Sequence, residues 1–172
     1  SSRRRSAARL NSGVMSHREF PASVTQATIC SYFWAGVAIG VLPFQSGKDW
    51  AFSVIEALDE PPIEVIEIAT ANDRNSAMDA LQAAAHGADQ QAAGRLLLAD
   101  ILAQLKSGDI SAAEATLAAM RIAQTTSLPD EVYYHFDGLD DELRLAANGA
   151  YGNPTEITLD VLKALEEHAG AT

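Results

Sequence analysis

Glycine, proline and helix-capping residues divide this chain into short segments, and these breaks constrain the fold more than any other feature of the sequence. None of the segments shows the sustained alternation of apolar and polar residues that a half-buried strand requires. Alanine accounts for 32 of the 172 residues and aromatic residues for only 6%, a bias that favours helices packed closely through small side chains. The sequence therefore predicts an all-α fold, a single compact bundle of about seven or eight short helices.

Start and stop signals place these helices along the chain. A run of Ile and Val alternating with Glu after the double proline is short and β-branched, but prolines favour a helix start and cannot sit in a central strand. The expected helices cover about residues 24–41, 46–58, 62–71, 76–86, 89–107, 111–124 and 156–169, with two shorter pieces on either side of Gly138.

Three Ser-x-x-acid pairs have the spacing of a capping box, in which the serine caps a helix and the acid reaches back to it. These pairs are Ser46 with Asp49, Ser76 with Asp79, and Ser111 with Glu114. The helix that starts after the first pair is expected to bury a stripe of apolar side chains, namely Trp50, Val54, Ile55 and Leu58.

Basic residues gather at the N-terminus. Residues 1–20 hold five arginines against one acidic residue, while the remaining 152 residues hold seven basic and 22 acidic side chains. We therefore predict a disordered basic tail over 1–20 and an all-helical acidic domain over 21–172. A twin-arginine export signal is the alternative, but the apolar stretch 29–44 begins about twenty residues after the arginines and contains Pro43. That stretch is too short to cross a bilayer, so we expect a buried helix and no membrane association.

The acidity of the domain bears on its partners. A nucleic-acid-binding surface must supply cations, so the domain is not expected to bind nucleic acid, and a basic protein is the expected partner. The single cysteine, Cys30, excludes an internal disulfide and a cysteine zinc site, which predicts a reducing cytoplasm. Cys30 lies among apolar residues and is expected to be a buried, inert thiol.

Signatures of catalysis are absent from the sequence. There is no Gly-x-Gly-x-x-Gly, phosphate loop, His-Glu-x-x-His or Gly-x-Ser-x-Gly, so we predict no catalytic residue and no cofactor. His86 and His168 are explained by the ends of their helices, where the dipole favours a charged imidazole.

One polar stretch, residues 135–142, offers ligands for a metal ion. Its spacing does not match a calcium-binding loop, and a tight turn at Gly138 followed by a capped helix is the simpler explanation. The candidate metal ligands in it, set against that explanation, are His135, Asp137, Asp140 and Asp141.

A second acidic group surrounds the double proline, where helical spacing places several carboxylates on one face. This group is the predicted partner-binding site, and a solvated helix face is the alternative. It consists of Glu56, Asp59, Glu60, Glu64 and Glu67.

Three hypotheses about function follow. The first is a non-catalytic protein-binding module, an antidote of the toxin–immunity kind that masks a basic partner. The second is a metal-dependent hydrolase or small-ligand binder that uses the acidic stretch from His135 to Glu142. The third is a structural subunit whose helix 24–41 is covered in a homo-oligomer.

Several short runs resemble a group of small uncharacterised bacterial proteins. The resembling residues are Trp50-Ala51 with Ile55, the double proline followed by Ile-Glu, Lys-Ser-Gly-Asp-Ile-Ser at 106–111, and Phe-Asp-Gly-Leu-Asp-Asp-Glu at 136–142. The resemblance implies an all-helical, acidic, cytoplasmic bacterial protein and carries no established activity.

Overall fold

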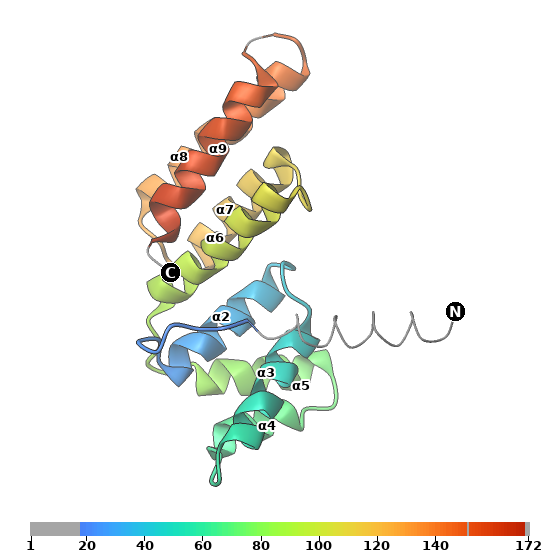
Figure 1. Cartoon of the computed structure of the whole chain (residues 1–172), viewed down its shortest axis with the longest axis vertical. Coiled ribbons are helices and arrows are strands. Elements are labelled where there is room, and N and C mark those ends of the chain that lie inside the picture. The colour runs from blue at the N-terminus through green and yellow to red at the C-terminus, as the bar shows by residue number, and fades with distance from the viewer. Residues whose placement is uncertain (1–17, 151, 171–172) are drawn as a thin grey trace, which may run out of the picture. The chain divides into compact units, whose positions relative to one another are not determined.

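The computed structural model describes residues 18–150 and 152–170, and within them the predicted all-helical class is confirmed (Figure 1). This part of the chain contains eight α-helices and no strand. The helices are α2 (Gln26–Ala38), α3 (Phe44–Ala57), α4 (Ile63–Ala69), α5 (Arg74–Ala84), α6 (Gln90–Ser107), α7 (Ala112–Thr125), α8 (Asp130–Ala147) and α9 (Pro154–Ala169).

The helices belong to two compact units. Among the described residues, unit 1 comprises 18–37 and 42–88, and unit 2 comprises 38–41, 89–150 and 152–170. The sequence pattern predicts one domain over residues 21–172 and does not indicate this division. Each unit is described by itself below.

Unit 1 packs α3 against both α4 and α5, and aromatic rings connect α2 to α3. The rings of Phe33 and Trp50 lie 5.7 Å apart between centroids. Phe20 meets Tyr32 edge to face at 5.1 Å, and the Arg18 guanidinium lies 5.0 Å from the Phe20 ring. Residues 18–20 fall within the tail expected over 1–20, yet they contact α2, while residues 1–17 lie outside the described part.

Helix α2 confirms the buried helix expected from the apolar stretch. Its buried positions include the small residues Ser31, Ala35 and Gly36 as well as Tyr32 and Phe33. Among the described residues, none of the helices combines the length and the apolar character needed to cross a lipid bilayer.

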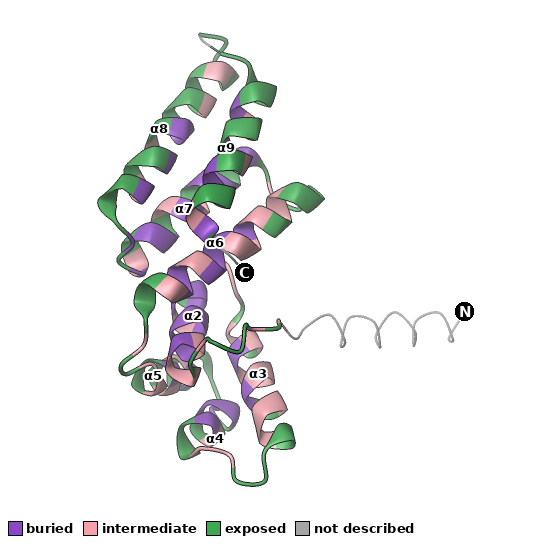
Figure 2. Ribbon diagram, turned by 60° about the vertical axis from the view of Figure 1, so that its left-hand side comes forward, coloured by how far each residue is buried: buried purple, intermediate pink, exposed green. Residues whose placement is uncertain are grey.

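Unit 2 packs α6 against α7 and α9, and α8 against the same two helices. In Figure 2, α8 and α9 show buried positions along one side and exposed positions along the other. Gly94 on α6 is buried, and a Cβ atom at this position would lie 2.2 Å from Thr126 Oγ1 at the end of α7. The backbone of α6 therefore approaches α7 so closely that only glycine fits there.

Helix caps agree with the sequence at some positions and differ at others. The predicted capping box of Ser111 and Glu114 is confirmed, because each residue's side chain accepts the other's backbone N–H. Gly108 ends α6 in the left-handed conformation. The box predicted at Ser46 is wrong, because α3 already begins after Pro43. The box predicted at Ser76 is also wrong, since Asp73 lies one turn earlier and accepts the Ser76 backbone N–H at 2.7 Å.

Helix α4 begins directly after Pro62, which confirms a helix where a strand was the competing interpretation. The break predicted at Gly138 is wrong, because α8 continues from Asp130 to Ala147 without interruption. A glycine inside a helix costs about 1 kcal/mol relative to alanine. The apolar side chains of Phe136 and Leu139 on either side of it are buried, and their burial outweighs that cost.

Candidate functional site

The five predicted partner-binding carboxylates are all exposed in unit 1. Glu56 lies in the last turn of α3, Asp59 and Glu60 lie in the connection, and Glu64 and Glu67 lie on α4. Because α3 packs against α4 and only residues 58–62 join them, the five carboxylates occupy adjoining segments of one unit.

This region has no basic side chain of its own. The 25 residues from Asp49 to Asp73 include seven acidic residues and no lysine or arginine. Lys48, the nearest cation before them, donates its ammonium N–H to the carbonyl of Ala71 at 2.6 Å. None of the five predicted carboxylates forms an ion pair with a described residue, so their charge is left uncompensated.

Large apolar side chains are exposed in the same segments. The exposed fraction is 47% for Phe52 on α3, 48% for Leu58 at its C-cap and 61% for Ile63 at the start of α4. Apolar side chains bordered by polar ones are typical of protein interfaces. We call the five carboxylates and these three side chains together the acidic α3–α4 surface.

The sequence pattern does not predict this apolar part. The buried stripe expected from it is wrong, because Trp50, Val54 and Ile55 are half-buried and Leu58 is exposed. Leu58 is the C-cap residue and adopts extended backbone angles, φ −117° and ψ 138°, so its side chain leaves the helical stripe. Counting positions at the helical period cannot find an exposed residue beyond the end of the helix.

The candidate metal ligands of residues 135–142 do not gather at one place, because α8 is continuous. Positions two apart on a helix point about 200° away from each other, which turns Asp137 away from His135. Asp140 is buried and forms an ion pair with Arg144, while Asp141 lies 3.8 Å from the same guanidinium. Hydrogen bonding and charge from Asp140 raise the pKa of Arg144, so these two carboxylates have a structural partner.

His135 instead meets a residue of α9. Its Nδ1 lies 2.8 Å from Nε2 of His168, and the side chain of Phe136 contacts both rings, with centroids at 5.9 and 5.7 Å. The carboxylate of Glu167 completes a group whose three potential ligand atoms all lie within 4.8 Å of one another. We call these three residues the His135–Glu167–His168 cluster.

Burial lowers the pKa of His168. The positive charge of a protonated His135 lowers it further, whereas the carboxylates of Glu167 and Glu131 raise it. The sequence predicts that the helix dipole favours a charged His168. This is wrong, because burial favours the neutral imidazole, and the sequence pattern does not indicate the contact with His135. The two histidines are 33 residues apart, and only the packing of α8 on α9 brings them together.

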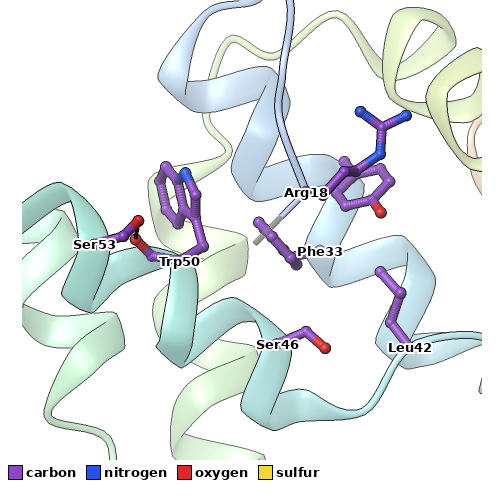
Figure 3. Close-up of a pocket in the computed structure, with 7 residues that line it drawn as sticks. Arg18, Phe33, Leu42, Ser46, Trp50 and Ser53 are labelled. Carbon is purple, nitrogen blue, oxygen red and sulfur yellow. Dashed lines mark hydrogen bonds between the residues drawn. The ribbon is translucent and has the colours of Figure 1, made fainter. Parts of the chain in front are cut away.

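Two concave regions accompany these features, one in each unit. In unit 2 an open groove of about 520 Å³ adjoins the cluster and is lined by His135, Glu167, Tyr134 and Lys163 among others. In unit 1 a pocket of about 90 Å³ lies between α2 and α3, with Arg18, Phe33 and Trp50 in its wall (Figure 3). Ligand sites commonly measure about 300–1,000 Å³, so the unit 1 pocket is too small for most ligands.

Cys30 is buried in α2. Burial, with a smaller contribution from Glu64, raises the pKa of its thiol to about 12. A thiol in this state is protonated and unreactive, which confirms the structural interpretation of this residue.

Comparisons with protein-family models, with curated proteins and with solved structures find no match to this chain. The resemblance to small bacterial proteins therefore stays a prediction.

Proposed function

We propose that this chain is a non-catalytic protein-binding module whose acidic α3–α4 surface binds a basic protein. In this proposal it acts as an immunity protein does, by masking the basic surface of a toxin or nuclease. The observation that carries the proposal is the combination of exposed, uncompensated carboxylates with exposed apolar side chains in one short part of unit 1.

The two components of the surface have separate physical roles. The carboxylates attract a cationic partner over a distance of about 8 Å at physiological ionic strength, which speeds association. The apolar side chains Phe52, Leu58 and Ile63 lose water contact on binding, which supplies affinity and slows dissociation. Binding by such a surface therefore weakens as salt concentration rises.

The hydrolase hypothesis has less support, because α8 separates the carboxylates that it requires from His135. The acidity of both units supports the absence of a nucleic-acid partner, and the lone buried thiol is compatible with a reducing cytoplasm. A homo-oligomer stays an alternative that light scattering on the purified protein distinguishes from a monomer.

The proposal is tested by affinity capture from native lysate with the wild-type chain and two charge-reversed variants. In the first variant, Glu60→Lys and Glu64→Lys alter the acidic α3–α4 surface. In the control, Glu142→Lys and Glu156→Lys make the same change in net charge at exposed positions of unit 2. We expect a stoichiometric basic protein on the wild-type chain and on the control. The first variant should bind it at least about tenfold more weakly.

Two results would contradict the proposal. One is the absence of any stoichiometric partner, and the other is a partner whose affinity falls equally in both variants. If the partner is a toxin or nuclease, adding the wild-type chain should inhibit it and adding the first variant should not.

A further inference from the structure

We propose that His135, Glu167 and His168 form a binding site for a divalent transition-metal ion of the zinc class. The site lies in unit 2, on a different part of the chain from the acidic α3–α4 surface, and it does not depend on protein binding. The geometry of the two imidazoles carries the inference. A ring nitrogen of His135 lies at hydrogen-bonding distance, 2.8 Å, from a ring nitrogen of His168, and the carboxylate of Glu167, the residue before His168 on α9, has an oxygen within 4.8 Å of both.

The type of ligand selects the type of metal. Imidazole nitrogens suit Zn²⁺, Cu²⁺ and Ni²⁺, whereas Mg²⁺ and Ca²⁺ prefer sites made of oxygen atoms. Two nitrogens and one carboxylate oxygen match the three protein ligands of many zinc sites, which leave a fourth position for water or another ligand. The cluster therefore favours a borderline transition metal over a hard cation.

Zinc binding requires only a small increase in the distance between the two ring nitrogens. Two nitrogens bound to tetrahedral zinc at about 2.0–2.1 Å lie about 3.3 Å apart, slightly more than the 2.8 Å between His135 and His168. Zinc binding would replace the hydrogen-bond contact between the two rings. Because His135 is exposed, its ring has room to rotate and turn the nitrogen toward the metal. His168 is partly buried and has Phe136 packed against its ring, which gives the site one well-positioned ligand.

Some charges around the cluster favour a bound cation, and one opposes it. Glu131 lies one turn before His135 on α8 and adds a second carboxylate that interacts electrostatically with His168. Lys163 lies one turn before Glu167 on α9 and lines the same groove, so its positive charge opposes the binding of a cation there. Unit 2 holds fourteen acidic and five basic side chains, and this excess of negative charge raises the local concentration of cations.

The test is a calorimetric titration of the untagged full chain with zinc chloride alone. We expect one zinc ion per chain with a dissociation constant in the micromolar range. His135→Gln and His168→Gln should each weaken binding by about tenfold or more, because each removes one nitrogen ligand. Glu167→Gln should weaken it less, and His86→Gln in unit 1 is the control that should leave binding unchanged.

His135→Gln is the decisive variant, because His135 is exposed and its replacement does not disturb the core. Circular dichroism without metal checks that each variant remains helical. In NMR spectra of the wild-type chain, zinc should shift the ring signals of His135 and His168 and leave those of His86 in place. The proposal is overturned if His135→Gln binds zinc as tightly as the wild type, if binding is only millimolar, or if one ion joins two chains.

Discussion

Unit 1 and unit 2 both carry more acidic than basic side chains, but they distribute them differently. Residues 18–37 and 42–88 hold nine acidic and three basic side chains, and unit 2 holds fourteen and five. In unit 2 some of this charge is paired within the unit, as in the contacts of Asp140 with Arg144 and of Lys106 with Glu166. In unit 1 the five carboxylates of the acidic α3–α4 surface have no such partner among the described residues.

Both units also expose large apolar side chains: Phe52, Leu58 and Ile63 in unit 1, and Leu117, Tyr134, Leu145 and Leu159 in unit 2. Phe136 of unit 2 is fully buried and contacts both histidines of the cluster, whereas Phe52 of unit 1 is half exposed beside uncompensated acids. Net charge alone therefore does not identify an interaction surface. The α3–α4 region combines carboxylates that have no ion-pair partner among the described residues with exposed apolar area, and this combination is typical of an interface.

The largest effect is expected on the free energy of unfolding when these two phenylalanines are replaced. Phe136→Ala should lower the free energy of unfolding by about 3–5 kcal/mol, because it removes a fully buried ring and leaves a cavity. Phe52→Ala should lower it by less than about 1 kcal/mol, because the ring is half exposed. Urea denaturation followed by circular dichroism measures both. If Phe52→Ala proves as destabilising as Phe136→Ala, then Phe52 belongs to a core and not to a binding surface.

The next largest effect on stability is expected from glycines at which helices approach each other closely. Gly94→Ala in unit 2 should cost about 2–3 kcal/mol, because the new Cβ would overlap Thr126. Gly47→Ala in unit 1 should cost less, since its Cβ would meet the flexible end of Leu81 at 3.3 Å. Gly138→Ala has no neighbour within 4 Å and should stabilise α8 by about 0.5–1 kcal/mol.

Thermal unfolding of the three glycine variants checks this order. A loss at Gly138 would mean that α8 needs flexibility at this position, and a neutral result at Gly94 would mean that α6 and α7 can move apart at little cost.

The smallest effect is the dependence of stability on pH. The pKa of His168 is lower in the folded state than its ordinary value of 6.5, so the unfolded chain binds more protons below that pH. The contribution of neutral His168 to stability is therefore complete above pH 6.5 and is lost as the pH falls through the folded-state pKa. The charged groups that influence His168 are His135 and Glu131 on α8 and Glu167 on α9.

Urea midpoints measured between about pH 5 and pH 8 test this expectation. His168→Gln should remove part of the fall in stability on the acid side, whereas His86→Gln in unit 1 should retain the wild-type profile. Identical profiles for the wild type and His168→Gln would contradict it.

The sequence predicts those features whose causes are local. The capping box of Ser111 and Glu114 depends on four consecutive residues, and it is present as expected. The Ser76 box has the same spacing but is absent, because Asp73 competes for the same backbone N–H. Gly138 looks like a break because a helical glycine is unfavourable on its own, yet burial on either side of it outweighs that local cost.

Features created by tertiary packing cannot be predicted from a local sequence pattern. The sequence identifies the five carboxylates of the acidic surface, but the exposure of Phe52 and Ile63 depends on which faces α3 and α4 turn toward α5. The contact between His135 and His168 depends on the register of α8 against α9, which no single-helix pattern contains. The sequence therefore indicates candidate ligands among the neighbours of His135 along α8, whereas the groups that approach its ring, His168 and Glu167, come from α9.

The buried thiol of Cys30 has a practical consequence. The thiol is fully buried and burial raises its pKa to about 12, so alkylating reagents react with it only when α2 leaves its packed position. Because it is the only cysteine in the chain, its rate of labelling reports how often unit 1 opens while the rest of the protein remains unmodified.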